Sequence, residues 1–184
     1  MTRFAVVVVA VSLAFGAGGA RALENENLLV SMPSGYKVGY HKNTPKGVIS
    51  EMVPAAETVE NWTEMVTVQI FLNMRDVTPA QYRTRMQKLW ATACPGSEFS
   101  KVKDGTENGY PTLTWLQKCP KNQQTGKPEI TWLKALQGRD SFYLVQKAYK
   151  FEPAAEQMSR WSSFLDSVRV CDTRLPDRPC RLGG

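Results

Sequence analysis

Residues 66–93 of the chain read VTVQIFLNMRDVTPAQYRTRMQKLWATA, and this stretch decides the fold class. Every second residue from Val66 to Leu72 is apolar, and the residues between them are of mixed character. A period of two residues is typical of a β-strand with one buried face. We therefore expect a central strand over residues 66–72.

The second part of this stretch carries the signals of an α-helix. Thr78 is suited to cap the helix, Pro79 to occupy its first position, and Gln81 to complete a capping box. Pro95-Gly96 then predicts its end. The apolar residues that follow the cap are expected on one face of the helix, toward a sheet: Tyr82, Met86, Leu89, Trp90 and Ala93.

Strand-like patterns occur on both sides of this unit, joined by short turns rich in Gly, Pro, Asn and Asp. The other expected strands cover residues 28–30, 36–40, 48–53, 98–103, 110–119, 130–136 and 142–149. We expect a loop marked by Asp104-Gly105 together with Asn108-Gly109, and a tight turn at Gly138-Arg139-Asp140.

A second helix is expected to begin near Pro153. Its apolar residues recur at helical spacing: Met158, Trp161, Leu165 and Val168. Short turns between strands make antiparallel neighbours, and strands do not alternate with helices. The sequence thus predicts one α+β domain over residues 23–184, an antiparallel β-sheet packed by two main helices in an α/β sandwich.

The N-terminal residues have the order of a secretory signal peptide. Arg3 is followed by an apolar run over residues 4–15, small residues, and the A-x-A site Ala20-Arg21-Ala22. A membrane-spanning helix needs about 20 apolar residues, and this run is shorter. We expect cleavage after Ala22, no later transmembrane segment, and a periplasmic or secreted mature protein.

The charge of the chain favours no strongly charged partner. The formal net charge of +6 includes Arg3 and Arg21, so it falls to +4 after cleavage. The basic residues are scattered among acidic ones and form no block of like charge. A nucleic-acid partner is therefore not expected, and a weak preference for anionic surfaces is the most that this charge predicts.

Four cysteines follow the predicted cleavage site, at Cys94, Cys119, Cys171 and Cys180. An even number in an exported chain indicates disulfide bonds, and four cysteines allow three pairings. We expect Cys94–Cys119, between a helix end and a strand, and Cys171–Cys180, which would close a Pro-rich tail (about residues 171–184) onto the end of a helix. A zinc site is the alternative, but the chain has no C-x-x-C pair and a single histidine.

The sequence shows no motif of a common catalytic class. His41 lies beside Tyr40 and Lys42 without an evident partner for acid–base chemistry, and we interpret it as a solvated residue near a strand end. Nucleotide-binding, metalloprotease and serine-hydrolase motifs are absent from the sequence. We assign no catalytic residue, metal or cofactor. The absence of these motifs does not exclude enzymes that need only two carboxylates.

Three carboxylates do cluster around a tryptophan: Glu57, Glu60 and Glu64 flank Trp62. If this stretch forms a helical turn, the carboxylates share a face, where they would be candidates for ligand binding or general acid chemistry. The alternative is a solvated turn that Trp62 anchors to the core.

The five tryptophans are candidates for a binding platform: Trp62, Trp90, Trp115, Trp132 and Trp161. We expect Trp90 and Trp161 in the core, on the apolar faces of the helices. Trp115 and Trp132 lie in strands that are candidate neighbours, where the rings would stack across the sheet, although a place in the core is the simpler expectation.

A short motif and the order of elements carry a family resemblance. The expected mature chain begins with L-x-x-x-x-P-x-G-(Y/W), from Leu28 through Met32 to Pro33-Ser34-Gly35-Tyr36, and in this it resembles the DcrB/PsbP-like superfamily. Residues 60–65 also resemble a segment of exported bacterial proteins. The resemblance covers most of residues 28–170 and implies a central antiparallel sheet with accessory or scaffold roles. It implies no catalytic residues, because the fold hosts unrelated functions.

From these observations we expect a periplasmic or secreted, non-enzymatic binding or accessory domain whose partner is an envelope protein or a small ligand. The alternative function is a carboxylate-dependent enzyme that acts on a cell-envelope polymer, with side chains from residues 57–64.

Overall fold

The computed structural model describes residues 24–180, so the expected signal peptide of residues 1–22 lies outside the described range. The described residues form nine strands and two helices: β1 (Glu26–Leu29), β2 (Tyr36–Thr44), β3 (Gly47–Pro54), β4 (Glu64–Leu72), α1 (Pro79–Ala93), β5 (Glu98–Glu107), β6 (Tyr110–Cys119), β7 (Glu129–Gln137), β8 (Ser141–Tyr149), α2 (Ala155–Ser167) and β9 (Arg169–Asp172).

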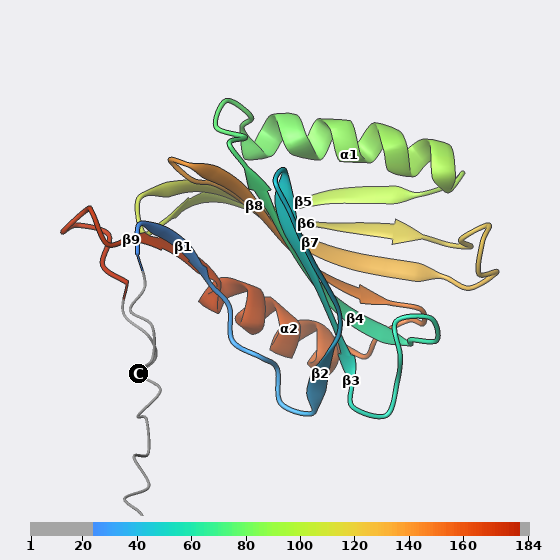
Figure 1. Ribbon diagram of the computed structural model, residues 1–184. Coiled ribbons are helices and arrows are strands. Elements are labelled where there is room, and N and C mark those ends of the chain that lie inside the picture. Colours follow the sequence, from blue (N-terminus) through green and yellow to red (C-terminus); the bar gives the residue numbers. More distant parts are fainter. Residues whose placement is uncertain (1–23, 181–184) are drawn as a thin grey trace, which may run out of the picture.

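Seven of the strands make one antiparallel sheet in the order β2-β3-β4-β8-β7-β6-β5. Helix α1 covers one face of this sheet and α2 the other (Figure 1). Strand β4 lies inside the sheet between β3 and β8, as its alternating pattern predicted. The expected α+β class, an antiparallel sheet with two main helices, is confirmed.

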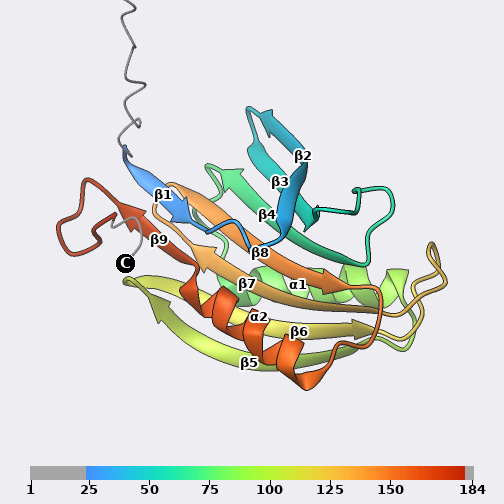
Figure 2. The same cartoon turned by 90° about the horizontal axis from the view of Figure 1, so that it is seen from below.

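The larger core lies between the sheet and α2, which runs across the strands in Figure 2. Trp161 and Leu165 are buried on α2 and Val168 is buried just after it, so the predicted apolar face of this helix is confirmed. The sheet contributes mostly aromatic and β-branched residues to this core: Val66, Trp132, Leu136, Tyr143, Val145 and Tyr149.

Helix α1 begins as predicted, with Thr78 and Gln81 in a capping box. Its predicted apolar face is wrong in part, because Leu89 is 58% exposed and Trp90 is only half-buried. Ala93, at the end of the predicted face, is also exposed, whereas Tyr82 packs on the core beneath the helix. The core beneath α1 consists of strand residues: Leu113, Trp115, Leu133, Ala135, Phe142 and Leu144.

Two details of the strands differ from expectation. Trp115 lies opposite Leu133 and Trp132 opposite Leu116, so the two indoles occupy opposite faces of the sheet and do not stack. Strand β5 continues through the loop expected at residues 104–105. Asn108 and Gly109 have φ of 50° and 77° and make the whole turn by themselves.

Strand β9 was not predicted, and it pairs with β1 in a separate two-stranded sheet. The disulfide Cys171–Cys180 therefore closes the tail onto a strand and not onto the end of a helix. The disulfide Cys94–Cys119 joins the C-cap of α1 to the end of β6. Both pairings are those that we expected. Neither helix in residues 24–180 is long and apolar enough to cross a bilayer.

Candidate functional site

A tight turn places the first aromatic residue of the site. Pro33 accepts a hydrogen bond from the backbone N–H of Tyr36 at 3.1 Å, and Gly35 has φ of 78°. A positive φ at the third residue is characteristic of a type II turn, which glycine adopts without strain. The turn directs the chain into β2, so that the side chain of Tyr36 packs on the core beneath α2.

Lys147 of β8 lies on the same face of the sheet as this core. Its strand partners are Val66 on β4 and Trp132 on β7, and none of its side chain is exposed. A charged side chain is rarely buried to this extent unless it is paired.

The partner of Lys147 is a carboxylate at the start of β4. Lys147 Nζ donates hydrogen bonds to Glu64 Oε2 and to the Tyr36 hydroxyl, both at 2.6 Å. The Tyr36 hydroxyl in turn donates to Glu64 Oε2 at 2.9 Å. The three groups form a closed hydrogen-bonded triangle that connects β2, β4 and β8.

Three aromatic rings surround the ammonium group of Lys147. Nζ lies 4.0 Å from the ring centroid of Trp161, 4.6 Å from that of Tyr149 and 5.0 Å from that of Tyr36. These distances allow cation–π attraction in addition to the ion pair. The protein therefore fills an aromatic cage with its own lysine.

Burial and pairing act in opposite directions on this lysine. Burial lowers the pKa of Lys147, the bond to Glu64 counteracts part of that effect, and the result is a pKa of about 8. Burial and the neighbouring Glu64 raise the pKa of Tyr36 well above its usual range, so that Tyr36 stays protonated near neutral pH.

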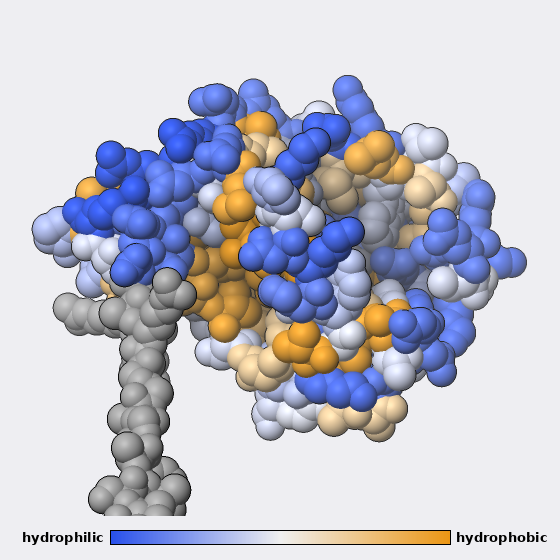
Figure 3. Space-filling model, viewed as in Figure 1, coloured by the Kyte–Doolittle hydropathy of each residue, from blue (hydrophilic) through white to orange (hydrophobic). Residues whose placement is uncertain are grey.

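A pocket of about 400 Å³, here called the α2 pocket, opens on the outer side of this cage. It lies between the turn that precedes β2 and helix α2, and its lining comes from these two segments: Pro33, Ser34, Tyr36, Arg160, Trp161 and Phe164. Tyr36 and Trp161 belong to both the cage and the pocket, with ring centroids 5.4 Å apart. Figure 3 shows that on this side of the molecule apolar side chains reach the surface between the β1–β9 pair and the β2–β3 hairpin.

Polar groups at this site are incompletely paired within the protein. Trp161 Nε1 and the Tyr149 hydroxyl are buried and have no hydrogen-bond partner among the described residues. Buried donors without acceptors are uncommon and cost stability. Arg160, which is exposed at the pocket, also has no ion-pair or hydrogen-bond partner within residues 24–180.

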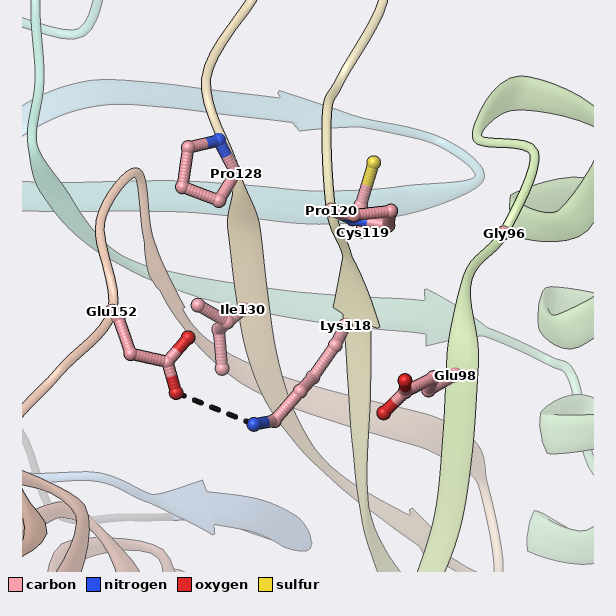
Figure 4. A pocket seen from close by; sticks show the side chains of 8 residues that line it. All are labelled: Gly96, Glu98, Lys118, Cys119, Pro120, Pro128, Ile130 and Glu152. Atoms are coloured by element: carbon pink, nitrogen blue, oxygen red, sulfur yellow. Dashed lines mark hydrogen bonds and ion pairs between the residues drawn. The ribbon is translucent and has the colours of Figure 1, made fainter.

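A second pocket, of about 210 Å³, lies beside the Cys94–Cys119 disulfide (Figure 4). Its charged residues are Glu98, Lys118 and Glu152, and the Lys118–Glu152 pair at 3.3 Å has both side chains exposed. Ligand sites usually have volumes of about 300–1,000 Å³. The α2 pocket, which is larger and more aromatic, is therefore the stronger candidate.

The structure separates the four site residues that the sequence suggested. Residues 55–63 form turns and bends, so the helical turn that we considered for them is wrong. Glu64 joins the buried triangle, Glu60 is exposed, and Trp62 packs against Lys150 with Nζ 3.8 Å from its ring centroid.

Glu57, the remaining carboxylate of this group, holds the loop before β4. It accepts hydrogen bonds from the backbone N–H and the hydroxyl of Thr63, at 2.7 Å and 2.5 Å. Burial opposes these bonds, but they hold the pKa of Glu57 below its ordinary value. Neither pocket is lined by Glu57, Glu60 or Glu64.

Sequence reasoning missed Lys147, Tyr36 and Arg160 as site residues. The sequence did contain a signal for Lys147, because alternation along the strand places it on the same face as the core residues Tyr143, Val145 and Tyr149. Arg160 carried none. Residues 24–180 contain no group of three His, Cys, Asp or Glu side chains placed to hold a metal ion.

No protein-family model matches the chain, and no curated protein sequence matches it. Three solved structures are similar in chain path. LpqN of Mycobacterium tuberculosis, described as involved in cell envelope biogenesis, shares 10% identity over 82% of this chain and 87% of its own, with a TM-score of 0.46. A variant of Mog1 shares 11% over 76% and 84%, with a TM-score of 0.44. The cyanobacterial PsbP of Synechocystis shares 14% over 83% and 94%, with a TM-score of 0.46. Membership of the DcrB/PsbP-like superfamily stays a prediction.

Proposed function

We propose that this chain is an exported, non-enzymatic binding or accessory domain of the cell envelope that holds a small ligand in the α2 pocket. The observation that carries the proposal is the aromatic lining of this pocket, backed by a fully buried and paired lysine. Ligand sites are typically concave and apolar with a few well-placed polar groups.

Export is supported by the two disulfide bonds, which persist in oxidising compartments. It is also supported by the predicted signal peptide over residues 1–22.

A binding role fits the groups at the pocket better than catalysis does. Lys147 is covered by the cage, and Tyr36 has a raised pKa, so neither is set to exchange protons with a ligand at neutral pH. The alternative of a carboxylate-dependent enzyme would need Glu57, Glu60 or Glu64 in a pocket, and the α2 pocket is lined by none of them.

The proposal is tested by filling the pocket from its exposed side. Ser34 lines the α2 pocket and is exposed, so Ser34→Trp would block it without touching the core. Ser31→Trp, three residues earlier in the same exposed segment and outside the lining, is the matched control.

The assay is thermal unfolding of the mature protein with a panel of alkyl and aromatic compounds that carry neutral, anionic or cationic head groups. We expect at least one compound to raise the melting temperature of wild type and of Ser31→Trp, but not of Ser34→Trp, and to be recovered unchanged. Equal stabilisation of all three proteins, or conversion of the compound into a product, would contradict the proposal. Stabilisation by no compound would instead favour an envelope protein as the partner.

A further inference from the structure

The α2 pocket has an unusual combination of charge and aromatic surface. Among the described residues that line it, Arg160 is the one charged side chain, and none is a carboxylate. The remaining lining consists of aromatic rings, a proline and the Ser34 hydroxyl. This pocket therefore offers a cation and a hydroxyl beside a mainly apolar wall.

Aromatic pockets often bind cationic ligands, because the face of an aromatic ring attracts positive charge. In this protein the ammonium group of Lys147 already lies against these rings on their core side. Lys147 Nζ lies over the Trp161 and Tyr36 rings at 4.0 Å and 5.0 Å from their centroids. A cationic head group on the outer side would meet ring faces that already hold an ammonium group, and Arg160 would repel it directly.

The carboxylates near the site do not compensate Arg160. Glu64 accepts hydrogen bonds from Lys147 and Tyr36 and so balances the buried ammonium. Glu57 is held by Thr63 in the loop before β4 and does not line the pocket. Arg160 makes no ion pair within residues 24–180, not even with Glu156 one turn earlier on α2, so no carboxylate contacts the positive charge at the pocket.

The apolar wall extends from this charge along the helix. Phe164 follows Arg160 by four residues, so both side chains lie on the same side of α2. Phe164 also packs edge-on against Trp161, with ring centroids 5.1 Å apart. A ligand whose charged group bound Arg160 would therefore place its apolar part against the rings of Phe164 and Trp161.

We propose that the α2 pocket binds a small amphipathic anion, with its charged head at Arg160 and Ser34 and its apolar body against Trp161 and Phe164. The inference rests on the proposed function and adds the chemical class of the ligand. A carboxylate and a phosphate head share the required chemistry, since guanidinium groups bind both through paired hydrogen bonds.

The test compares four probes that each have a linear chain of ten carbons, with the carboxyl carbon counted in decanoate, and different head groups, by calorimetric titration of the mature protein at fixed salt. The probes are decanoate, decyl phosphate, decanol and decyltrimethylammonium. We expect both anions to bind at least about fivefold more tightly than decanol, the size of one partly exposed charged hydrogen bond, and the ammonium probe no better than decanol. The tighter of the two anions, after allowance of about fourfold for the additional methylene of decyl phosphate, identifies the head group as carboxylate or phosphate.

Arg160→Gln removes the charge at an exposed position of α2 and should lower the affinity for decanoate to that for decanol. Arg85 is also exposed and lies on α1 at the other face of the sheet, so Arg85→Gln is the matched control and should bind decanoate as wild type does. An Arg160→Gln protein that keeps the preference for anions would overturn the proposal.

The outcomes separate the ligand class from the site itself. If decanol or the ammonium probe binds as tightly as decanoate, and Ser34→Trp abolishes that binding, the pocket stands and the anionic class is wrong. If Ser34→Trp binds decanoate as wild type does, the α2 pocket is not the site, and the proposed function fails with it. No saturable binding of either anion also overturns the inference.

Discussion

The Glu64→Gln substitution tests the buried ion pair through its pH dependence. The change keeps the shape of the side chain and removes the charge that balances Lys147, whose side chain is fully buried. Breaking a buried pair in this way typically costs about 3–5 kcal/mol. Lys147 can avoid part of that cost by releasing its proton, because the neutral amine needs no buried partner charge.

The pKa of Lys147 determines the free energy that is needed to release this proton at a given pH. In wild type the pKa is about 8, so at pH 8 the neutral form is as stable as the charged one. At pH 6, two units lower, the neutral form lies about 3 kcal/mol above the charged form. The cost of Glu64→Gln should therefore stay under about 1 kcal/mol at pH 8 and reach about 2–3 kcal/mol at pH 6.

The sign follows from proton linkage. Burial lowers the pKa of Lys147 below that of a lysine in the unfolded chain, about 10.4. In wild type the contribution of Lys147 to stability is therefore flat below pH 8 and rises between pH 8 and about pH 10.4. In Glu64→Gln the folded protein loses the lysine proton at a lower pH, so stability should continue to fall on acidification below pH 8, by about 1.4 kcal/mol per unit.

The assay is urea unfolding at pH 6, 7 and 8, at constant ionic strength, followed by tryptophan fluorescence. Lys147→Met with Glu64→Gln is the control, because the double variant lacks both members of the pair and its stability relative to wild type should not change between pH 6 and pH 7. A Glu64→Gln protein whose loss of stability is the same at pH 6 and pH 8 would refute the reasoning. A double variant whose stability still falls on acidification below pH 8 would also refute it.

Three further substitutions test the elements that hold the site in place, each measured by urea unfolding at pH 7. Glu26→Ala should lower stability by about 3 kcal/mol, because this carboxylate accepts hydrogen bonds from the backbone N–H groups of residues 139–141 and from Tyr143; a loss under about 1 kcal/mol would contradict this. Lys134→Met should cost about 1–3 kcal/mol and fray the end of α2, where Lys134 Nζ donates to two backbone carbonyls at 2.7 Å and 2.8 Å; unchanged amide-exchange protection in the last turn of α2 would argue against that role. Replacing Cys94 and Cys119 together by Ala should cost about 3.5 kcal/mol from the loop that spans 25 residues, and an unchanged urea midpoint would show that the bond adds nothing.

Local patterns were sufficient to predict most of the fold. The alternation at residues 66–72 and the cap at Thr78 specify an interior strand and the start of a helix through contacts near in sequence. Strand β9 could not be found in this way. Its four residues pair with β1, 140 or more positions away, and no local pattern carries that information.

The site was predicted less well, for a physical reason. Glu57, Glu60 and Glu64 are close in sequence, but a loop without helical periodicity sends each carboxylate to a different neighbour. The groups that do meet come from three separate segments, at Tyr36, Lys147 and Arg160. Lys147 is the exception that sequence could have revealed, since a lysine at a core position of a strand needs a buried partner.

The central claim is that the α2 pocket binds ligand beside Trp161, and the indole N–H signals in an ¹H–¹⁵N NMR spectrum test it most directly. Trp115 serves as an internal reference, because its indole is buried on the opposite face of the sheet and bonded to Gln117 at 3.3 Å. Titration with decanoate should shift the Trp161 signal saturably and leave the Trp115 signal in place, with Trp161→Phe supplying the assignment. A Trp161 signal that stays unmoved at saturating decanoate would contradict the account.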